Sequence, residues 1–326
     1  MFRIGDKELE NNILLAPMAG VTDKAFRLIT KPFGPALMYT EMVSGKGLFH
    51  GSRKTAALLE TDDAERPTAV QIFGHEPDVM AKIAYEALGF GAEILDINMG
   101  CPAPKITGNG DGSALSKNPR LAGEIISAVC REVSVPVTVK IRSGWDSESQ
   151  NAVEMAKIAE QNGASAVCVH GRTREQFYSG KADLGIIRDV CRAVSIPVIG
   201  NGDISDGKSA ETMLRSTGCA AIMIGRAAQG NPWVFSHVRE YLKTGVEPEP
   251  PSIEERAGIM EKHLSLLLRF KGEVRGILEA RKHMAWYVKG LTGGARLREI
   301  INSSCSESDM RRAIDIFRRG KIPEQL

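Results

Sequence analysis

The segment EILDINMGCPAPK, residues 93–105, carries the most information about the fold. It opens as a short, mostly apolar run at Glu93–Asn98, ends that run on a polar residue, and then turns at a glycine and two prolines. A short run that is nearly all apolar is typical of a parallel strand covered on both faces. Comparable runs recur along the chain, and we predict eight strands: Ile13–Met18, Ala36–Glu41, Thr68–Phe73, Glu93–Asn98, Val137–Ile141, Ala166–His170, Val198–Asn201 and Ala221–Gly225.

Amphipathic segments separate these runs and are predicted to be helices. Asp23, Ser149 and Asp206 stand where three of the helices would begin, and their side chains are common N-caps. Strands and helices that alternate over about 225 residues predict an α/β fold, a (β/α)8 TIM barrel. The predicted helices are Asp23–Lys31, Ser52–Leu59, Pro77–Leu88, Pro119–Arg131, Ser149–Gln161, Leu184–Val194 and Asp206–Ser216.

A doubly wound open sheet is the alternative fold. No glycine-rich dinucleotide motif follows the first strand, and the run Gly108–Gly112 follows the fourth strand with the wrong spacing. The ends of the strands also favour the barrel, because seven of the eight residues there are polar or charged. In a barrel these ends converge on one face, where barrel enzymes hold their active sites. The simpler interpretation is that strands end where polar loops begin. The eight residues are Met18, Glu41, Gln71, Asn98, Lys140, His170, Asn201 and Arg226.

The pattern changes after Asn231–Trp233. Residues 244–251 are rich in proline and predict a stiff linker between a barrel domain, residues 1–243, and a small all-helical domain, residues 252–326. From Pro251 onward the chain has 15 Lys and Arg against 10 Asp and Glu, whereas the remainder has a net charge of −3. This asymmetry suggests a polyanionic partner for the tail, although a solvated helical surface explains it as well. The helices predicted there are Ile253–Phe270, Val274–Tyr287 and Glu307–Arg319.

Composition excludes several classes of protein. The chain has 326 residues, 43% of them hydrophobic, with no apolar stretch long enough to span a membrane and no secretory signal in Met1–Glu10. Its six cysteines are scattered and form no C-x-x-C pair, which indicates reduced thiols. No His, Asp and Glu cluster has metal-ligand spacing, so no metal is expected. We expect a monomer in the cytoplasm.

Two strand ends carry reactive groups. Cys101 is fixed between Gly100 and Pro102 at the functional face, and an ordinary thiol is protonated at neutral pH, so it can donate a proton. The glycine-rich loop after it, residues 106–113, could close over the site. Lys140 follows a strand of apolar and β-branched residues, and its charge suits an anionic ligand or an electron-rich ring. The alternative for Lys140 is a buried ion pair with Asp96 or Glu41.

A nucleotide phosphate is predicted at the last two strands. The loops Gly200–Asp203 and Gly225–Arg226 follow the seventh and eighth strands, where barrels often bind phosphate. Glycines let backbone N–H groups approach the oxygens, and an arginine can bind them bidentately. The exit of the first strand, Ala16–Gly20, could support a flat ring, and His170 has two arginines in its loop. Together these features favour flavin mononucleotide, FMN, over a metal. The sequence has neither a G-x-S-x-G elbow nor a P-loop.

These motifs resemble those of the tRNA-dihydrouridine synthases, and more narrowly of the bacterial DusB-like branch, over nearly the whole chain. The Asn-x-Gly-Cys-Pro and His-Gly-Arg-Thr segments are the most specific, whereas Ala-Pro-Met and the phosphate loops are shared with other flavin barrels. One departure is Asp111, where the family often has a small residue. The resemblance rests on Ala16–Gly20, Ser44, Gln71–Gly74, Asn98–Pro102 with Lys105, Gly112–Leu115, Val139–Arg142, His170–Thr173, Gly200–Asp203 and Gly225–Arg226.

The resemblance implies an FMN enzyme that uses NADPH or NADH to reduce the C5–C6 double bond of D-loop uridines in tRNA. Hydride would pass from the flavin N5 to C6 of a flipped-out uracil, and Cys101 would protonate C5. Asn98 and Arg142 would hold the uracil edge, and the basic tail would bind the RNA backbone. The FMN ligands implied are Pro17, Met18, Ala19, Gln71, Lys140, His170, Asn201, Gly202, Asp203, Gly225 and Arg226.

Two other functions remain open from the residues alone. A small-molecule FMN barrel, similar to a dihydroorotate dehydrogenase, would share the flavin and the strand-end lysine but would not need a basic helical appendage. A non-catalytic RNA-binding protein on a barrel scaffold would not need Cys101 or the flavin residues.

Overall fold

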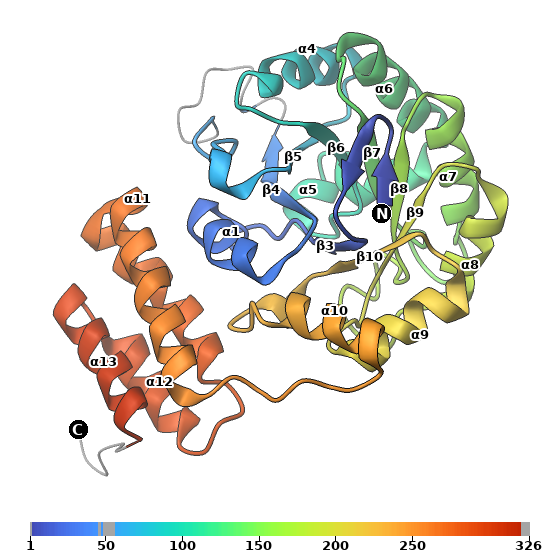
Figure 1. Ribbon diagram of the computed structural model, residues 1–326. Coiled ribbons are helices and arrows are strands. Elements are labelled where there is room, and N and C mark those ends of the chain that lie inside the picture. Colours follow the sequence, from blue (N-terminus) through green and yellow to red (C-terminus); the bar gives the residue numbers. More distant parts are fainter. Residues whose placement is uncertain (1, 45–46, 48–55, 321–326) are drawn as a thin grey trace. The chain divides into compact units, whose positions relative to one another are not determined.

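The computed structural model describes residues 2–44, 47 and 56–320, and its central feature is a closed barrel of eight parallel strands. The order around the barrel is β10-β3-β4-β5-β6-β7-β8-β9, so each strand pairs with its neighbours in sequence and the last closes on the first (Figure 1). The predicted TIM barrel is confirmed. Its strands are β3 (Ile13–Leu15), β4 (Leu37–Ser44), β5 (Thr68–Phe73), β6 (Ile94–Met99), β7 (Val137–Arg142), β8 (Ala166–His170), β9 (Val198–Asn201) and β10 (Ala221–Ile224).

The register aligns the functional ends of neighbouring strands. Asn98 pairs with Lys140, Arg142 with His170, and His170 with Asn201. All residues of β5, β6, β8, β9 and β10 are buried, as expected where side chains fill the barrel on one face and helices cover the other.

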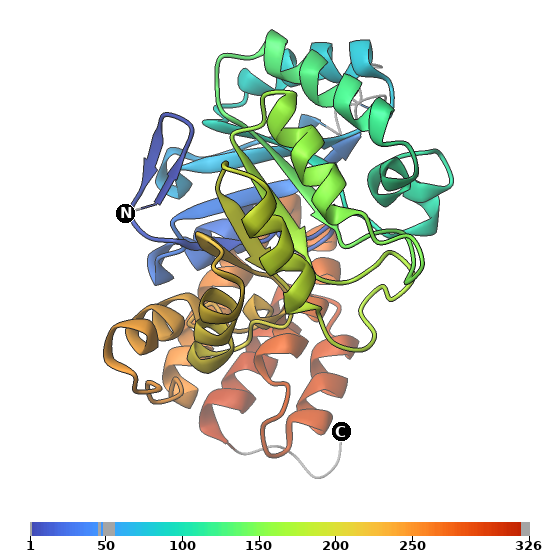
Figure 2. The same cartoon turned by 90° about the vertical axis from the view of Figure 1, so that its right-hand side faces the viewer.

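Helices lie outside the strands (Figures 1 and 2). The predicted cap at Asp206 is confirmed, because its side chain accepts from the Ser209 N–H in a capping box. The cap predicted at Ser149 is wrong: Ser149 bonds to Asp146 in the preceding turn, and the helix begins at Ala152. Residues 52–55 of the predicted helix Ser52–Leu59 lie outside the described residues. The elements are α1 (Lys24–Thr30), η1 (Lys31–Phe33), η2 (Asp63–Glu65), α4 (Pro77–Leu88), α5 (Pro104–Thr107), η3 (Gly112–Lys117), α6 (Pro119–Glu132), α7 (Ala152–Gln161), α8 (Leu184–Ala193) and α9 (Gly207–Thr217).

An N-terminal hairpin that the sequence did not predict, β1 (Phe2–Ile4) with β2 (Lys7–Leu9), closes the amino-terminal end of the barrel. Phe2, Ile4 and Leu9 are buried in one cluster with side chains of the barrel strands. The hairpin turn at Gly5 reaches Pro136 and Ser165, which precede β7 and β8. Strands of three residues are too short for a recognisable alternation. The carboxyl-terminal end of the barrel is left for the site.

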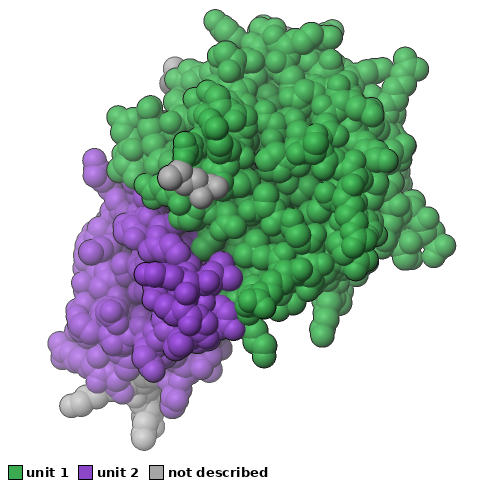
Figure 3. All heavy atoms as spheres, turned by 45° about the vertical axis from the view of Figure 1, so that its right-hand side comes forward, with its two compact units in different colours: residues 1–24, 35–225 green, residues 25–34, 226–326 purple. Residues whose placement is uncertain are grey.

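The structure divides into two compact units, shown in green and purple in Figure 3. The first comprises Met1–Lys24 and Pro35–Gly225, and the second Ala25–Gly34 and Arg226–Leu326. The second unit contains η4 (Arg226–Ala228), α10 (Val234–Thr244), α11 (Ile253–Tyr287), α12 (Gly294–Ser303) and α13 (Glu307–Arg319). The domain boundaries expected at residues 243 and 252 stay predictions.

Helices α10 and α12 were not predicted, whereas α13 has the predicted bounds. The break predicted after Phe270 is present inside α11, where Gly272 has non-helical angles of φ 72° and ψ 169°. Apolar side chains from α11, α12 and α13 form one buried core, which includes Leu264, Ile301 and Ile314. Within the described ranges, no helix has both the length and the apolar composition needed to cross a membrane.

Candidate active site

Polar side chains from successive strands meet at the carboxyl-terminal mouth of the barrel. Their mutual hydrogen bonds join β5 to β6 through Gln71 and Asn98, and β7 to β9 through Lys140 and Asn201. The structure therefore brings these four predicted site residues together in two pairs.

The backbone around Cys101 is held from two sides. Asn98 Oδ1 accepts from the N–H groups of Gly100 at 3.1 Å and Cys101 at 2.9 Å. Ser113 donates to the Cys101 carbonyl from its N–H, at 3.1 Å, and from its Oγ, at 2.9 Å. Gly112, with φ +60°, is required there because a Cβ would lie 2.8 Å from the same carbonyl oxygen. The turn is rigid, so the thiol has a defined position.

The Cys101 thiol is protonated at neutral pH. Burial raises its pKa above the ordinary value, and the opposing influences of the Ala103 N–H, Arg142 and Lys140 are smaller. Lys140 thus lowers the pKa of Cys101, as its proximity suggests, but does not overcome the cost of burying a thiolate.

A buried carboxylate lies behind the turn. Asp96 Oδ2 accepts from Gln71 Nε2 at 2.6 Å, Gln71 Oε1 accepts from Asn98 Nδ2 at 2.8 Å, and Thr138 Oγ1 donates to the other Asp96 oxygen. Burial raises the pKa of Asp96 to about 6, although hydrogen bonds from Gln71 and Thr138 oppose the shift. Sequence reasoning missed this role of Asp96. The signal was an aspartate in the middle of an otherwise apolar strand.

Lys140 is half-buried on β7, and its Nζ donates to Asn201 Oδ1 at 3.0 Å. Asn201 Nδ2 in turn donates to the Met223 carbonyl at 2.7 Å. Among the described residues no carboxylate lies within ion-pair distance of Lys140, so the alternative pairing with Asp96 or Glu41 is wrong. Burial lowers the pKa of Lys140. An ammonium has three donors, so two remain for a ligand.

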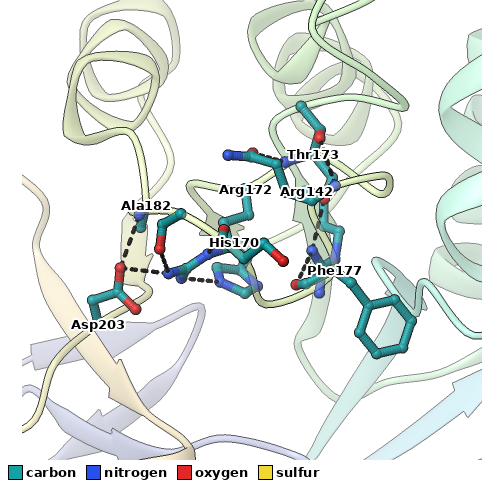
Figure 4. A network of polar contacts seen from close by, with 10 residues as sticks. Arg142, His170, Arg172, Thr173, Phe177, Ala182 and Asp203 are labelled. Atoms are coloured by element: carbon teal, nitrogen blue, oxygen red, sulfur yellow. Dashed lines mark hydrogen bonds and ion pairs between the residues drawn. The ribbon is translucent and has the colours of Figure 1, made fainter.

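Arg142 is buried and connects two loops (Figure 4). Its Nε donates to the Gly100 carbonyl at 2.9 Å, and its Nη1 donates to the carbonyls of Thr173 and Phe177, both at 2.8 Å. The guanidinium therefore fixes the turn before Cys101 against the loop after β8.

His170 lies beside a second buried arginine (Figure 4). Arg172 Nη1 is 3.5 Å from His170 Nε2, and Arg172 Nη2 donates to Asp203 Oδ2 at 2.8 Å. Gly202 has φ +126°, and a Cβ there would lie 2.6 Å from Ala182 Cβ and 3.1 Å from His170 Cδ2. The backbone at residue 202 lies so close to Ala182 and His170 that only glycine fits there. Sequence reasoning gave Arg172 no role of its own.

The exit of the first barrel strand forms a tight turn. The Met18 carbonyl accepts from the N–H groups of Val21 at 2.9 Å and Thr22 at 3.0 Å. Pro17 and Ala19 flank Met18 in this turn. A Cβ on Gly225 would meet Ala16 at 3.6 Å and Met18 Sδ at 3.8 Å, so the ends of β3 and β10 are adjacent. Arg226 begins the second unit.

His75 and Asp111 form a pair that sequence reasoning missed. His75 Nδ1 lies 2.7 Å from Asp111 Oδ1, which joins the loop after β5 to the loop that follows Cys101. Asp111 directly precedes Gly112 and Ser113, the residues in contact with the Cys101 carbonyl. The signals were a histidine just past a strand end and the unusual aspartate. Within the described residues, no three His, Cys, Asp or Glu side chains gather as a metal site would require.

Comparison with known proteins identifies the family of this chain. The family model described as "Dihydrouridine synthase (Dus)" matches residues 14–319. The chain belongs to the dihydrouridine synthase family. The expected resemblance is confirmed, and the matched residues include every predicted site residue.

Members of the family with similar sequences include a probable tRNA-dihydrouridine synthase of Rickettsia conorii. It is 47% identical over 305 residues, which cover 93% of this chain and 92% of the relative. The tRNA-dihydrouridine synthase B of Pseudomonas aeruginosa is 44% identical over 300 residues, 92% of this chain and 90% of that one. Among solved structures, histamine dehydrogenase from Rhizobium sp. 4-9 matches with a TM-score of 0.59 at 13% identity. That match covers 99% of this chain and 64% of the other, and it shows a shared fold alone.

Proposed function

We propose that this dihydrouridine synthase reduces the C5–C6 double bond of uridines in tRNA, with FMN as its cofactor and NADPH or NADH as reductant. The observation that carries the proposal is the Cys101 thiol, which a rigid turn holds at the barrel mouth and whose pKa burial keeps raised. Such a group is an acid at neutral pH and a poor nucleophile. The names of the relatives support tRNA as the substrate.

The residues at the mouth fit a flavin nucleotide. Lys140 has donors to spare for an electron-rich ring, and the Gly202 backbone packs against His170, so the proposed phosphate loop and the proposed FMN ligand His170 are adjacent. We propose that FMN is held by Pro17, Met18, Ala19, Gln71, Lys140, His170, Asn201, Gly202, Asp203, Gly225 and Arg226.

Bound FMN, once reduced by NADPH or NADH, would supply the hydride that adds to C6 of the base. The Sγ–H of Cys101 gives its proton to C5, so the double bond gains one hydride and one proton. The resulting thiolate is stabilised by Arg142 and Lys140, which lower the pKa of Cys101, and it recovers a proton from solvent. Burial of the thiol keeps it protonated before each turnover.

Asn98 and Arg142 are the proposed contacts to the uracil edge. Asn98 already accepts from two backbone N–H groups, and Arg142 already donates to three carbonyls. An arginine has five N–H donors and a carboxamide nitrogen has two, so these hydrogen bonds do not use every donor that the two side chains carry. Both side chains also position the turn that carries Cys101.

We propose that residues 252–326 bind tRNA and direct the barrel to D-loop uridines in the cytoplasm. Some cations there have carboxylate neighbours: Lys271 and Arg275 share Glu279, and Arg296 contacts Glu299. Phosphates must compete with these carboxylates. The proposed contacts are Arg269, Lys271, Arg275, Arg281, Lys282, Lys289, Arg296 and Arg298.

The test uses purified full-length protein. Absorbance of the protein and the mass of the released cofactor test for FMN. In the activity assay, tRNA from cells lacking the gene is incubated with the protein and NADPH or NADH, and dihydrouridine is then measured by mass spectrometry. Free uracil, dihydroorotate and tRNA are compared as substrates. Cys101→Ala should stay yellow while dihydrouridine formation collapses, and Cys305→Ala, which changes an exposed thiol, should resemble the wild type. Product formation by Cys101→Ala at the wild-type rate, or purified protein without flavin, would contradict the proposal.

A further inference from the structure

Four residues on the loops beyond β6, β7 and β8 form a surface that we call the rim: Lys117, Trp145, Arg174 and Phe177. The Nζ of Lys117 lies 3.5 Å from the centroid of a Trp145 ring, and the Arg174 guanidinium carbon lies 4.6 Å from it. One indole thus orders two cations that come from different loops.

In the part of the chain that the structure describes, neither Lys117 nor Arg174 forms an ion pair, whereas Arg172 in the same loop is paired with Asp203. The carboxylate of Asp146 lies near Lys117. The pKa of Asp146 is lowered chiefly by hydrogen bonds from Ser149 and to a smaller extent by the charge of Lys117. Asp146 Oδ1, however, already accepts from Ser149 and from the Glu148 N–H. Lys117 and Arg174 are both held by the Trp145 ring, and together they favour the binding of an anion from outside the chain.

Phe177 is held out into solvent at a conformational cost. The residue is 41% exposed, and its φ of +54° is uncommon for a residue other than glycine. Arg142 fixes it by donating to the Phe177 carbonyl, and the Phe177 N–H bonds to the Arg174 carbonyl at 3.1 Å. Figure 4 shows the ring pointing away from the polar network around His170. The ring meets the Tyr178 ring edge to face, with centroids 5.1 Å apart, and both residues are exposed.

We propose that the rim binds the RNA strand next to the target uridine, with a backbone phosphate between Lys117 and Arg174 and a neighbouring base stacked on Phe177. Ordered cations beside an exposed aromatic ring are the features by which proteins hold single-stranded nucleic acid. Trp145 follows Arg142, the last residue of β7, and Lys117 is the last residue of η3. Arg142 and η3 both contact the Cys101 turn, so a strand on the rim leads to the site. The inference rests on the proposed function for its substrate.

The experiment measures equilibrium binding of an unmodified tRNA transcript to the full-length protein across a series of salt concentrations. Each phosphate contact contributes about 0.9 to the slope of log K against log salt. Lys117→Ala and Arg174→Ala should each make the slope shallower, by at most about 1 because they share one phosphate, and weaken binding about 5-fold near physiological salt. Phe177→Ala should weaken binding about 10-fold with an unchanged slope, and Phe177→Tyr should bind as the wild type does.

The control is Arg215→Ala, which removes an exposed cation from the last turn of α9, at the opposite end of the barrel. It should change neither the affinity nor the slope. In turnover assays the rim variants should raise the KM for tRNA and keep kcat at saturation. Binding is read independently of catalysis, so failure of the wild type to form dihydrouridine would reject the proposed function alone. If the three alanine variants bind tRNA with the affinity and salt slope of the wild type, the rim does not bind RNA and the inference is rejected.

Discussion

Asn98 Oδ1 accepts the backbone N–H of Cys101 over 2.9 Å. The same amide donates through Nδ2 to Gln71, which is bound to the buried Asp96. The position of the reactive thiol is thus tied through one side chain to a polar chain inside the barrel. A residue proposed to contact the substrate thus also positions the proposed acid.

Asn98→Ala should therefore reduce the rate of dihydrouridine formation more than it reduces flavin content. It leaves the Cys101 N–H and Gln71 Oε1 without partners, at a cost of about 1–3 kcal/mol each, and frees the turn. A displacement of about 1 Å can cost about 100-fold in rate. The measurement is kcat on tRNA together with the melting temperature. An unchanged kcat would show that the turn does not need Asn98.

Cys101 should react slowly with iodoacetamide at pH 7.5 and faster as the pH rises past the ordinary thiol range. The reason is that burial raises its pKa, so the reactive thiolate forms only at higher pH. Lys140→Met should move the reaction midpoint to a still higher pH, because Lys140 favours the thiolate. The rate is followed by mass spectrometry in a Cys305→Ser background, which removes the exposed thiol. A midpoint below that of a free cysteine would contradict the role of Cys101 as an acid.

Gly202→Ala should lower flavin content and activity. The added methyl would lie 2.6 Å from Ala182 Cβ and near His170, at a φ that alanine rarely adopts. Gly218→Ala is the matched control, because Gly218 has φ +72° but no atom within 4 Å of an added Cβ. It should cost about 1 kcal/mol of stability without affecting flavin. Equal flavin content in the two variants would contradict the crowding argument.

His75→Ala and Asp111→Ala should each slow turnover, and the double variant should be little worse than either single one. The 2.7 Å contact fixes the segment that leads to Gly112 and Ser113, so both substitutions release the same support for Cys101. A double-mutant cycle in unfolding free energy should give a coupling of about 1 kcal/mol. His75→Asn retains a donor near the Nδ1 position and should restore part of the rate. Additive effects would mean that the pair does not act as a unit.

The sequence predicted most of the fold because its signals are local. The bounds of Thr68–Phe73, Ala166–His170 and Val198–Asn201 are those of β5, β8 and β9, since a buried parallel strand is a short apolar run whatever surrounds it. The hairpin at Phe2–Leu9 and helix α12 were missed because three-residue strands and a ten-residue helix present too short a pattern.

The sequence singled out the residues of the candidate site, but it did not predict the contacts that these residues make. Cys101 and Lys140 stood out because their types are unusual at strand ends. Arg142 was expected to face the substrate, yet it is buried and spans three backbone carbonyls. No local pattern distinguishes an arginine that binds a ligand from one that binds loops, because both need only a planar set of donors.

The amino-acid sequence by itself determined the order of strands and helices, the glycine and proline turn that carries Cys101, and the polar residues at or near the carboxyl ends of the strands. Only the tertiary structure decided their partners. Gln71 meets Asp96 across 25 residues of chain, His75 meets Asp111 across 36, and Lys140 meets Asn201 across 61. Secondary structure follows from neighbours along the backbone, whereas these hydrogen bonds exist only after the barrel closes and its register brings separate strand ends together.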